Sequence, residues 1–220
     1  SLMNRIPVVA VSIGMATGIY AVSFGALGVT AGLSILETML LSLLMFSGAS
    51  QFAFVGVVAT GGMAAIPTAI ASAWLLGVRN GFYALRMAPV LGMPGITKLL
   101  SAQLTIDEST AVATSQGNES EERRGFWWTG VSVFVFWNLM TLAGALLGDQ
   151  IGDPANYGLD SAAAAAFLGL VWPRLSSSKF KLIGLAAFIT ALATTSTVPA
   201  GIPVLLGALV AALIQYWGKK

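Results

Sequence analysis

The stretch TMLLSLLMFSGASQFAFVGVVATGGMAAIPTAIASAWLLGV, residues 38–78, contains no charged side chain. A transmembrane helix needs about 20 consecutive, mostly apolar residues, so this stretch is long enough for two membrane spans. Gly61-Gly62 and Pro67 lie within it, and both are residue types that end or restart helices. The stretch therefore predicts two spans joined by a short turn.

The composition of the whole chain agrees with a membrane protein. Hydrophobic residues make up 56% of the 220 residues and charged residues 9%, against roughly 45–50% and 25% in soluble proteins. A soluble domain of this length needs more polar surface than so few charges supply. We therefore expect residues 1–220 to form a single integral membrane domain in a lipid bilayer.

The chain contains neither cysteine nor histidine, and its formal net charge is +2. Disulfides, thiolate nucleophiles, imidazole bases and most transition-metal sites are therefore excluded. The basic residues are scattered near the ends of apolar segments and form no polybasic patch, which argues against nucleic-acid binding. We expect no metal and no cofactor.

Further apolar segments bring the total to about seven spans, within a range of roughly six to eight. We expect one span in each of the segments 6–36, 125–148 and 161–173. The segment 182–218 divides at residues 194–201, where Thr, Ser, Pro and Gly cluster, and is expected to hold two spans. The predicted fold class is all-α, a polytopic transmembrane helical bundle.

The segment 86–124 fits three descriptions, because it mixes prolines, glycines and charges. It fits a cytoplasmic loop, a re-entrant hairpin or an eighth, broken span, since irregular backbone is tolerated at membrane depth only where protein or a water-filled cavity covers it. Loop charge favours seven spans with the N-terminus outside. Only Arg5 then lies outside, and every other lysine and arginine lies inside.

A weak internal similarity suggests an inverted repeat with broken helices. Glycine-containing segments at residues 23–25 and 32–34 precede one predicted span, and residues 157–160 precede another. With seven spans, spans one to three would pair with spans four to six in the opposite orientation, as in many secondary transporters.

Asp107 and Glu108 are the first candidates for a functional site. An ionised carboxylate at bilayer depth costs about 3 kcal/mol on insertion scales, so it normally faces a cavity or a partner. A carboxylate here could hold an ammonium group or take up a proton during transport. The alternative is a pair of solvated loop acids near Lys98.

Arg79 and Asn80 are the second candidates. On a continuous helix, Arg79 would share one face with Thr68, Ser72 and Tyr83, which makes a polar stripe in an apolar helix. A guanidinium and an amide could bind a carboxylate through directed hydrogen bonds. The alternative is an arginine that extends to the cytoplasmic interface, with Asn80 as a helix cap.

Ser47, Ser50 and Gln51 are spaced to line one side of a helix in an otherwise apolar run. They fit either a substrate-facing role or hydrogen bonding at a helix packing seam. Phe24 precedes Gly25 and Gly28, which predict a helix interruption that frees backbone groups for a ligand. Close packing of small residues is the alternative.

Five motifs stand in order over nearly the whole chain: Phe24-Gly25, FSGASQF at 46–52, VRNGFY at 78–83, Ile106-Asp107-Glu108 and Tyr157-Gly158-Leu159-Asp160. Together they resemble the AzlC-type branched-chain amino-acid permeases. The resemblance implies proton-coupled export of branched-chain amino acids, and in some members methionine, across the cell inner membrane. It also implies a small AzlD-type membrane subunit as partner. Members commonly have Arg-His where this chain has Arg79-Asn80, so a proton relay through that imidazole is absent here.

The resemblance favours a transport path bordered by Asp107, Glu108, Arg79, Asn80 and Gln51. In our hypothesis Arg79 and Asn80 bind the substrate carboxylate, and Asp107 or Glu108 binds the ammonium or the coupled proton. Apolar residues around Phe24 and Phe52 would accept the aliphatic side chain.

Three other functions remain open on the sequence. One is export of another small metabolite, and one is a non-transporting scaffold or a passive channel. The third is a membrane-embedded transferase with Asp107 and Glu108 as acid and base, but the chain lacks a recognisable nucleophile motif. We therefore expect a transporter rather than an enzyme.

Overall fold

The computed structural model describes residues 5–92, 94–151, 168, 171–172 and 175–218. All regular elements in these residues are helices, and they contain no strand, which confirms the all-α class. The expected span at 161–173 falls almost entirely outside the described residues, as does the motif at 157–160.

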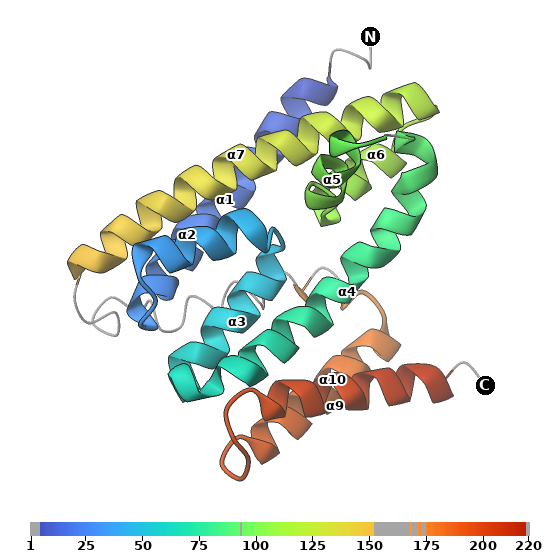
Figure 1. Ribbon diagram of the computed structural model, residues 1–220. Helices are drawn as coiled ribbons and strands as arrows, with labels where there is room; N and C mark the ends of the chain where they lie inside the picture. The colour runs from blue at the N-terminus through green and yellow to red at the C-terminus, as the bar shows by residue number, and fades with distance from the viewer. Residues whose placement is uncertain (1–4, 93, 152–167, 169–170, 173–174, 219–220) are drawn as a thin grey trace.

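The helices in chain order are α1 (Ile6–Thr30), α2 (Ile35–Leu44), α3 (Gly48–Gly61), the short 3-10 helix η2 (Met63–Ala65), α4 (Ile66–Leu91), α5 (Ile96–Gln103), α6 (Asp107–Thr114), α7 (Glu119–Ile151), α9 (Ser178–Thr194) and α10 (Ile202–Trp217) (Figure 1). The predicted turn after α3 is confirmed, because Gly62 has φ +63° and Pro67 lies in the first turn of α4. The predicted division at 194–201 is also confirmed.

The first predicted span of residues 38–78 is broken into two helices. A capping box between Ser34 and Glu37 starts α2, which ends at Leu44, and α3 begins only at Gly48. Gln51 closes the gap, because its Nε2 donates to the Met45 carbonyl oxygen at 2.8 Å. The prediction of an unbroken span here is wrong, since a side chain replaces the missing backbone hydrogen bond.

Helices α1 and α7 pack backbone to backbone through glycines. A Cβ atom at Gly25 would overlap the Thr141 carbonyl oxygen, and one at Gly144 would overlap the Val22 carbonyl oxygen. Helix α1 continues through Gly25 and Gly28 without interruption. The predicted interruption is therefore wrong, and close packing of small residues is what the structure shows.

Helices α1 and α7 run in the same direction. Gly14 lies against Ser132 and Gly25 lies against Thr141, so contacting positions rise together along both helices. The predicted inverted repeat requires these two spans to be antiparallel, so that pairing is wrong. In Figure 1 both helices begin at the same end of the molecule, so Arg5, just before α1, lies at the same end as Arg123 and Arg124 near the start of α7, and its expected position on the opposite side from these two bases is wrong.

Helices α2 and α3 form a hairpin, here the first hairpin, whose tip lies part-way along α7. Ser42 on α2 donates a hydrogen bond to Thr141 at 3.2 Å. Further along, Phe46 at the tip packs edge-on against Phe134, with ring centroids 5.0 Å apart. Helix α2 therefore runs antiparallel to α7 and enters from the end of the molecule where α7 finishes.

Helices α5 and α6 form a second hairpin that enters from the opposite end. Leu104 at its tip lies against Gly130 of α7, whereas Ala113, near the end of α6, lies against Gly125. The segment 86–124 therefore has the hairpin geometry, one of the three alternatives. The two tips meet, because Gln103 Nε2 donates to the Leu43 carbonyl oxygen at 2.6 Å.

Helices α9 and α10 form an antiparallel pair beside this core. Gly207 of α10 lies against Ala187 of α9, and Lys179 Nζ donates to the Gly218 carbonyl oxygen at 3.2 Å. The loop before α10 packs on the turn between α3 and α4, where a Cβ at Gly201 would meet Thr68.

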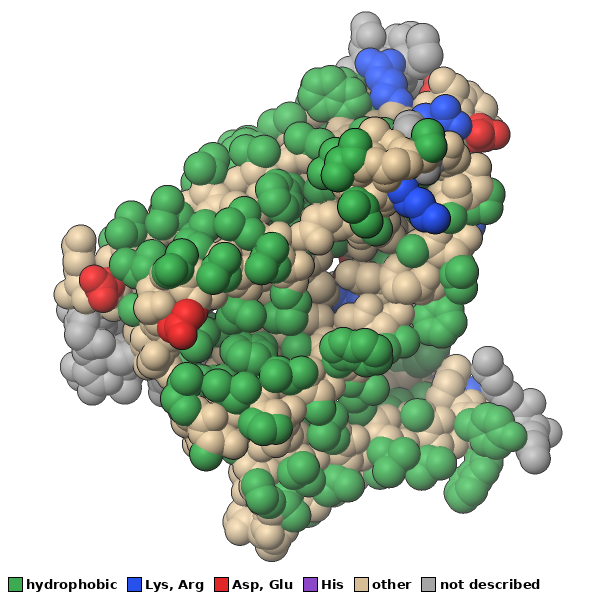
Figure 2. Space-filling view, in the orientation of Figure 1, with side chains coloured by type: hydrophobic (Ala, Val, Ile, Leu, Met, Phe, Trp, Pro, Cys, Tyr) green, Lys and Arg blue, Asp and Glu red, His purple; other side chains and the backbone are tan. Residues whose placement is uncertain are grey.

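Among the described residues, two helices are long and apolar enough to cross a membrane by length and composition, namely Ile6–Thr30 and Glu119–Gln150. The helices Ile35–Leu44, Gly48–Gly61 and Ile202–Trp217 are apolar but shorter. The prediction of about seven spans is therefore not confirmed. Apolar side chains nevertheless cover most of the face in Figure 2, with charged side chains gathered toward the ends of the molecule.

Candidate functional site

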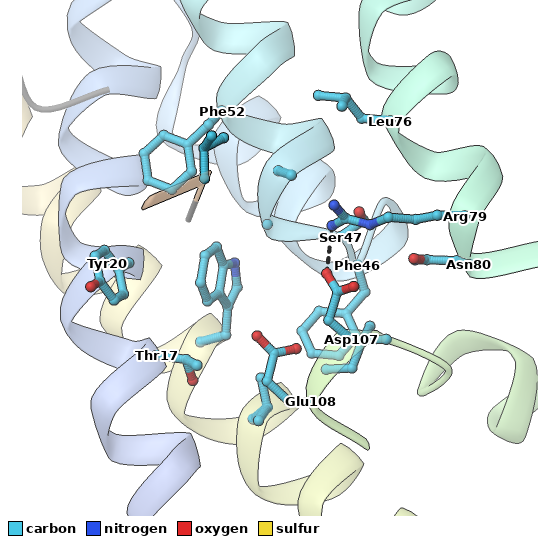
Figure 3. Close-up of a pocket in the computed structure, with 16 residues that line it drawn as sticks. Thr17, Tyr20, Phe46, Ser47, Phe52, Leu76, Arg79, Asn80, Asp107 and Glu108 are labelled. Carbon is cyan, nitrogen blue, oxygen red and sulfur yellow. Dashed lines mark ion pairs between the residues drawn. The ribbon is translucent and has the colours of Figure 1, made fainter. Parts of the chain in front are cut away.

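An ion pair between α4 and α6 lies where the two hairpin tips meet. Arg79 Nη2 is 2.6 Å from Asp107 Oδ2, and each side chain is 27% exposed. The Tyr83 hydroxyl, one helical turn after Arg79, donates to Asp107 Oδ1 at 2.6 Å. Figure 3 shows Arg79 and Asp107 turned toward each other from facing elements. The structure thus favours an engaged Asp107 over a solvated loop acid.

The tip of the second hairpin is held by its own hydroxyl groups. The Thr105 hydroxyl donates to the Ser101 carbonyl oxygen at 2.7 Å. The Ser109 hydroxyl donates to the Leu104 carbonyl oxygen at 2.6 Å and accepts from the Ile106 N–H at 3.1 Å. These bonds satisfy backbone groups that the break between α5 and α6 leaves free, and so fix Asp107 at the start of α6.

A cavity of about 170 Å³ opens beside this ion pair. Both hairpin tips contribute to it, together with α1, α4 and the middle of α7. The predicted residues on its wall are Ser47, Arg79, Asn80, Asp107 and Glu108, and Thr17, Tyr20, Phe46, Phe52 and Trp137 join them. In Figure 3 the Glu108 carboxylate lies between Thr17 and Asp107. The structure therefore brings five of the eight predicted residues to one cavity.

Two buried polar atoms at this cavity have no hydrogen-bond partner among the residues that the structure describes. They are Arg79 Nε, a donor, and Asn80 Oδ1, an acceptor. Leaving such a group unsatisfied costs about 1–3 kcal/mol. Buried polar groups are normally paired, so an unpaired donor and an unpaired acceptor on neighbouring residues are typical of a site that binds a polar ligand.

Gln51 and Phe24 lie behind the wall of the cavity. Gln51 is 0% exposed, and its Oε1 accepts from Trp137 Nε1 at 2.7 Å. Phe24 is fully buried and packs against Phe52 and Trp137, with centroid distances of 5.9 and 6.4 Å. The expected direct roles of Gln51 and Phe24 are therefore corrected: both support Trp137, which itself lines the cavity.

Ser50 faces a neighbouring cavity, not the ion pair. Its hydroxyl and that of Ser47 are 3.1 Å apart and share a hydrogen bond. The pattern of polar residues did point to the first hairpin, but it did not show that the hairpin tip separates two cavities.

Trp137 and Gln103 are site residues that the sequence analysis missed. Trp137 lies in the middle of the predicted span 125–148, far from the interfacial positions where tryptophans usually anchor, and this was a usable signal. Gln103 donates to the Leu43 and Leu44 carbonyl oxygens at 2.6 and 3.4 Å and so joins the hairpin tips. Nothing local to Gln103 indicates a contact with residues so distant in sequence.

A metal centre finds no support in the part of the chain that the structure describes. No group of three or more acidic side chains there is placed to hold a metal ion. The chemistry open to the cavity is binding of charged groups, with two acids that can attract a cation and a guanidinium that can pair with an anion.

A family model described as AzlC protein matches residues 12–151 of this chain. The matched range includes all the cavity-lining residues named above, and it ends where α7 ends. No curated protein and no solved structure matches the chain.

Proposed function

The chain belongs to the AzlC protein family, which is associated with branched-chain amino-acid transport, and from that premise we propose a secondary transporter subunit that exports branched-chain amino acids. Methionine is a further candidate substrate. The observation that carries the proposal is the ion pair of Arg79 and Asp107 in a small cavity between two hairpin tips. Secondary transporters bind substrate in this way, between interrupted helices inside the membrane.

The cavity offers a partner for each charged group of an amino acid. The Arg79 guanidinium can bind the carboxylate through directed hydrogen bonds, and its Nε has no partner in the described residues. The unpaired Asn80 Oδ1 is an acceptor, so it suits the ammonium and not the carboxylate expected from the sequence. The carboxylates of Asp107 and Glu108 supply further negative charge for the ammonium.

In our proposal the substrate carboxylate competes with Asp107 for Arg79. The Asp107 carboxylate already holds the guanidinium at 2.6 Å, so binding exchanges one carboxylate for another on the same cation. Asp107 is our candidate for linking substrate binding to the coupled proton, because it is the carboxylate that this exchange releases from Arg79.

We propose an inner-membrane location with the N-terminus in the cytoplasm. At the end where α1 and α7 begin, Arg5 precedes α1, Arg123 and Arg124 lie near the start of α7, Arg86 pairs with Glu122 there, and Lys98 lies in the first turn of α5. Cytoplasmic ends of membrane proteins are enriched in lysine and arginine. In the seven-span prediction Arg5 is the only base outside the cytoplasm. With the N-terminus in the cytoplasm, Arg5 also follows the rule. The small AzlD-type subunit stays a proposed partner.

The test is counterflow of labelled valine, leucine, isoleucine and methionine into proteoliposomes under an imposed pH gradient. It is run with and without a candidate small partner subunit. Uptake that follows the gradient and is competed by aliphatic amino acids supports the proposal. Absence of flux for all four, with folded protein and partner present, contradicts it and directs the search to other small metabolites.

A matched pair of variants ties the flux to the cavity. Asp107→Asn removes the carboxylate from the cavity, whereas Glu122→Gln breaks the ion pair with Arg86 at the end of α4, where Arg86 is half exposed. We expect the first to abolish flux and the second to leave it unchanged. No observation favours the transferase. The Asp107 carboxylate pairs with Arg79 and accepts a hydrogen bond from Tyr83, whereas a catalytic acid or base would have to be open to a substrate.

A further inference from the structure

A second cavity of about 570 Å³ lies beside the first, between α4 and the two hairpin tips. The two cavities share three lining residues, Phe46, Ser47 and Asn80. Asn80 follows Arg79 directly, so a ligand with its charged groups at Arg79 reaches the second cavity past Asn80. The two cavities therefore adjoin at these three residues.

The sizes of the cavities differ in a way that matters for an amino acid. Small-molecule pockets are commonly about 300–1,000 Å³. The first cavity, at about 170 Å³, lies below that range, and the second, at about 570 Å³, lies within it. The charged groups of an amino acid suit the first cavity, where Arg79 and Asp107 lie, and the second cavity is the larger space that adjoins it.

The wall of the second cavity suits an apolar group. Its α4 side presents Ala73, Gly77 and Gly81, with Trp74 at the mouth, where it is 75% exposed. The Ser50 hydroxyl in this wall is already hydrogen-bonded to Ser47, so it does not need a polar group of the ligand as a partner. Phe24, in contrast, is sealed within the protein and cannot receive a side chain.

We infer that the second cavity receives the aliphatic side chain of the transported amino acid, and that Gly77 and Gly81 determine how large that side chain can be. The inference rests on the proposed function and deepens it. The carboxylate and ammonium stay at Arg79 and its neighbours, and the hydrocarbon part extends past Asn80 along α4. Of the expected apolar site, Phe24 is fully buried, whereas Phe52 lines the first cavity.

The two glycines can be enlarged without moving the backbone. A Cβ at Gly77 meets only Ser50 Oγ, at the ordinary contact distance of 3.4 Å, and a Cβ at Gly81 meets nothing within 4 Å. Neither glycine has positive φ. New side chains at these positions therefore occupy cavity space rather than strain the helix. Gly56 on α3 is a matched control, because its Cβ also meets nothing within 4 Å and it lines neither cavity.

The experiment measures the ratio of leucine to alanine flux in proteoliposomes for Gly77→Ala, Gly81→Val and the control Gly56→Val. We expect the ratio to fall roughly tenfold in Gly81→Val, since loss of room for one or two methyl groups discriminates by that order. Gly77→Ala should shift it in the same direction by a smaller factor, and Gly56→Val should keep the wild-type ratio. An unchanged ratio in both cavity variants, or an equal shift in the control, overturns the inference.

A second measurement uses the absence of native cysteine. A maleimide should label Gly81→Cys, and leucine should protect it several-fold better than glycine does. Equal protection by both amino acids contradicts the inference even where flux is normal. Wild-type protein that carries no amino acid contradicts the proposed function instead, so the two failures are distinguishable.

Discussion

Replacing Asp107 by asparagine tests the central contact of the site. The substitution keeps the shape of the side chain and removes its charge, so Arg79 loses the anion that lies 2.6 Å away. Exposed ion pairs contribute about 0–1 kcal/mol, and breaking a fully buried pair costs about 3–5 kcal/mol. With 27% exposure on both sides, the pair lies between these limits. We expect the free energy of unfolding to fall by about 2 kcal/mol.

The assay is thermal unfolding of the detergent-solubilised protein, with and without leucine. Because Asp107 competes with the substrate carboxylate in our proposal, Asp107→Asn should be less stable alone but gain more from leucine than the wild type does. Flux should be lost, since the neutral side chain can no longer exchange a proton. Asp107→Asn would thus still bind leucine but no longer transport it.

The control is Glu122→Gln, which breaks the ion pair with Arg86 at the end of α4. This substitution should change the stability by no more than about 1 kcal/mol and leave the leucine response unchanged. The reasoning is refuted if Asp107→Asn is as stable as the wild type and transports normally. It is also refuted if leucine stabilises the variant less than the wild type.

Three further predictions follow from the packing. Gly25→Ala should destabilise the protein by about 3 kcal/mol or prevent folding, because its Cβ overlaps the Thr141 carbonyl oxygen; size-exclusion profiles and melting curves check this against Gly56→Ala. Gln51→Leu should lower the free energy of unfolding by about 1–3 kcal/mol, since it leaves the Trp137 N–H unpaired and removes the side-chain donor to the Met45 carbonyl oxygen; a melting curve that matches the wild type would contradict it. Gln103→Ala should cost only about 1 kcal/mol but increase maleimide labelling of Ser47→Cys, because it releases one hairpin tip from the other. Equal labelling rates with and without Gln103 would show that this contact does not limit access to Ser47 between the hairpin tips.

The two hairpins enter from opposite ends of the molecule, and their tips meet in its middle. Each hairpin stops part-way along α7, at Phe134 for the first tip and Gly130 for the second. The carbonyl groups freed by the first break are satisfied by Gln51 and Gln103. Irregular backbone of this kind is tolerated inside a membrane only when protein supplies the missing hydrogen bonds.

The sequence by itself determined the features that depend on local periodicity and composition. The apolar runs identified helical segments at α1, α7, α9 and α10, and glycine and proline marked the turn before α4. The polar stripe on α4 put Arg79 and Tyr83 on one face, and both contact Asp107 in the structure. Helical spacing is a property of consecutive residues, so it can be read without knowing the fold.

Only the tertiary structure decided which distant residues meet. The break after Leu44 interrupts a continuous apolar run, and the side chains of Gln51 and Gln103 donate to carbonyl groups at this break. The parallel packing of α1 and α7 depends on glycines that face each other across more than half of the chain. The pairing of Arg79 with Asp107 and the two cavities depend on how the hairpins enter from opposite ends. Such contacts follow from the balance of packing and hydrogen bonding over the whole molecule, which no local pattern encodes.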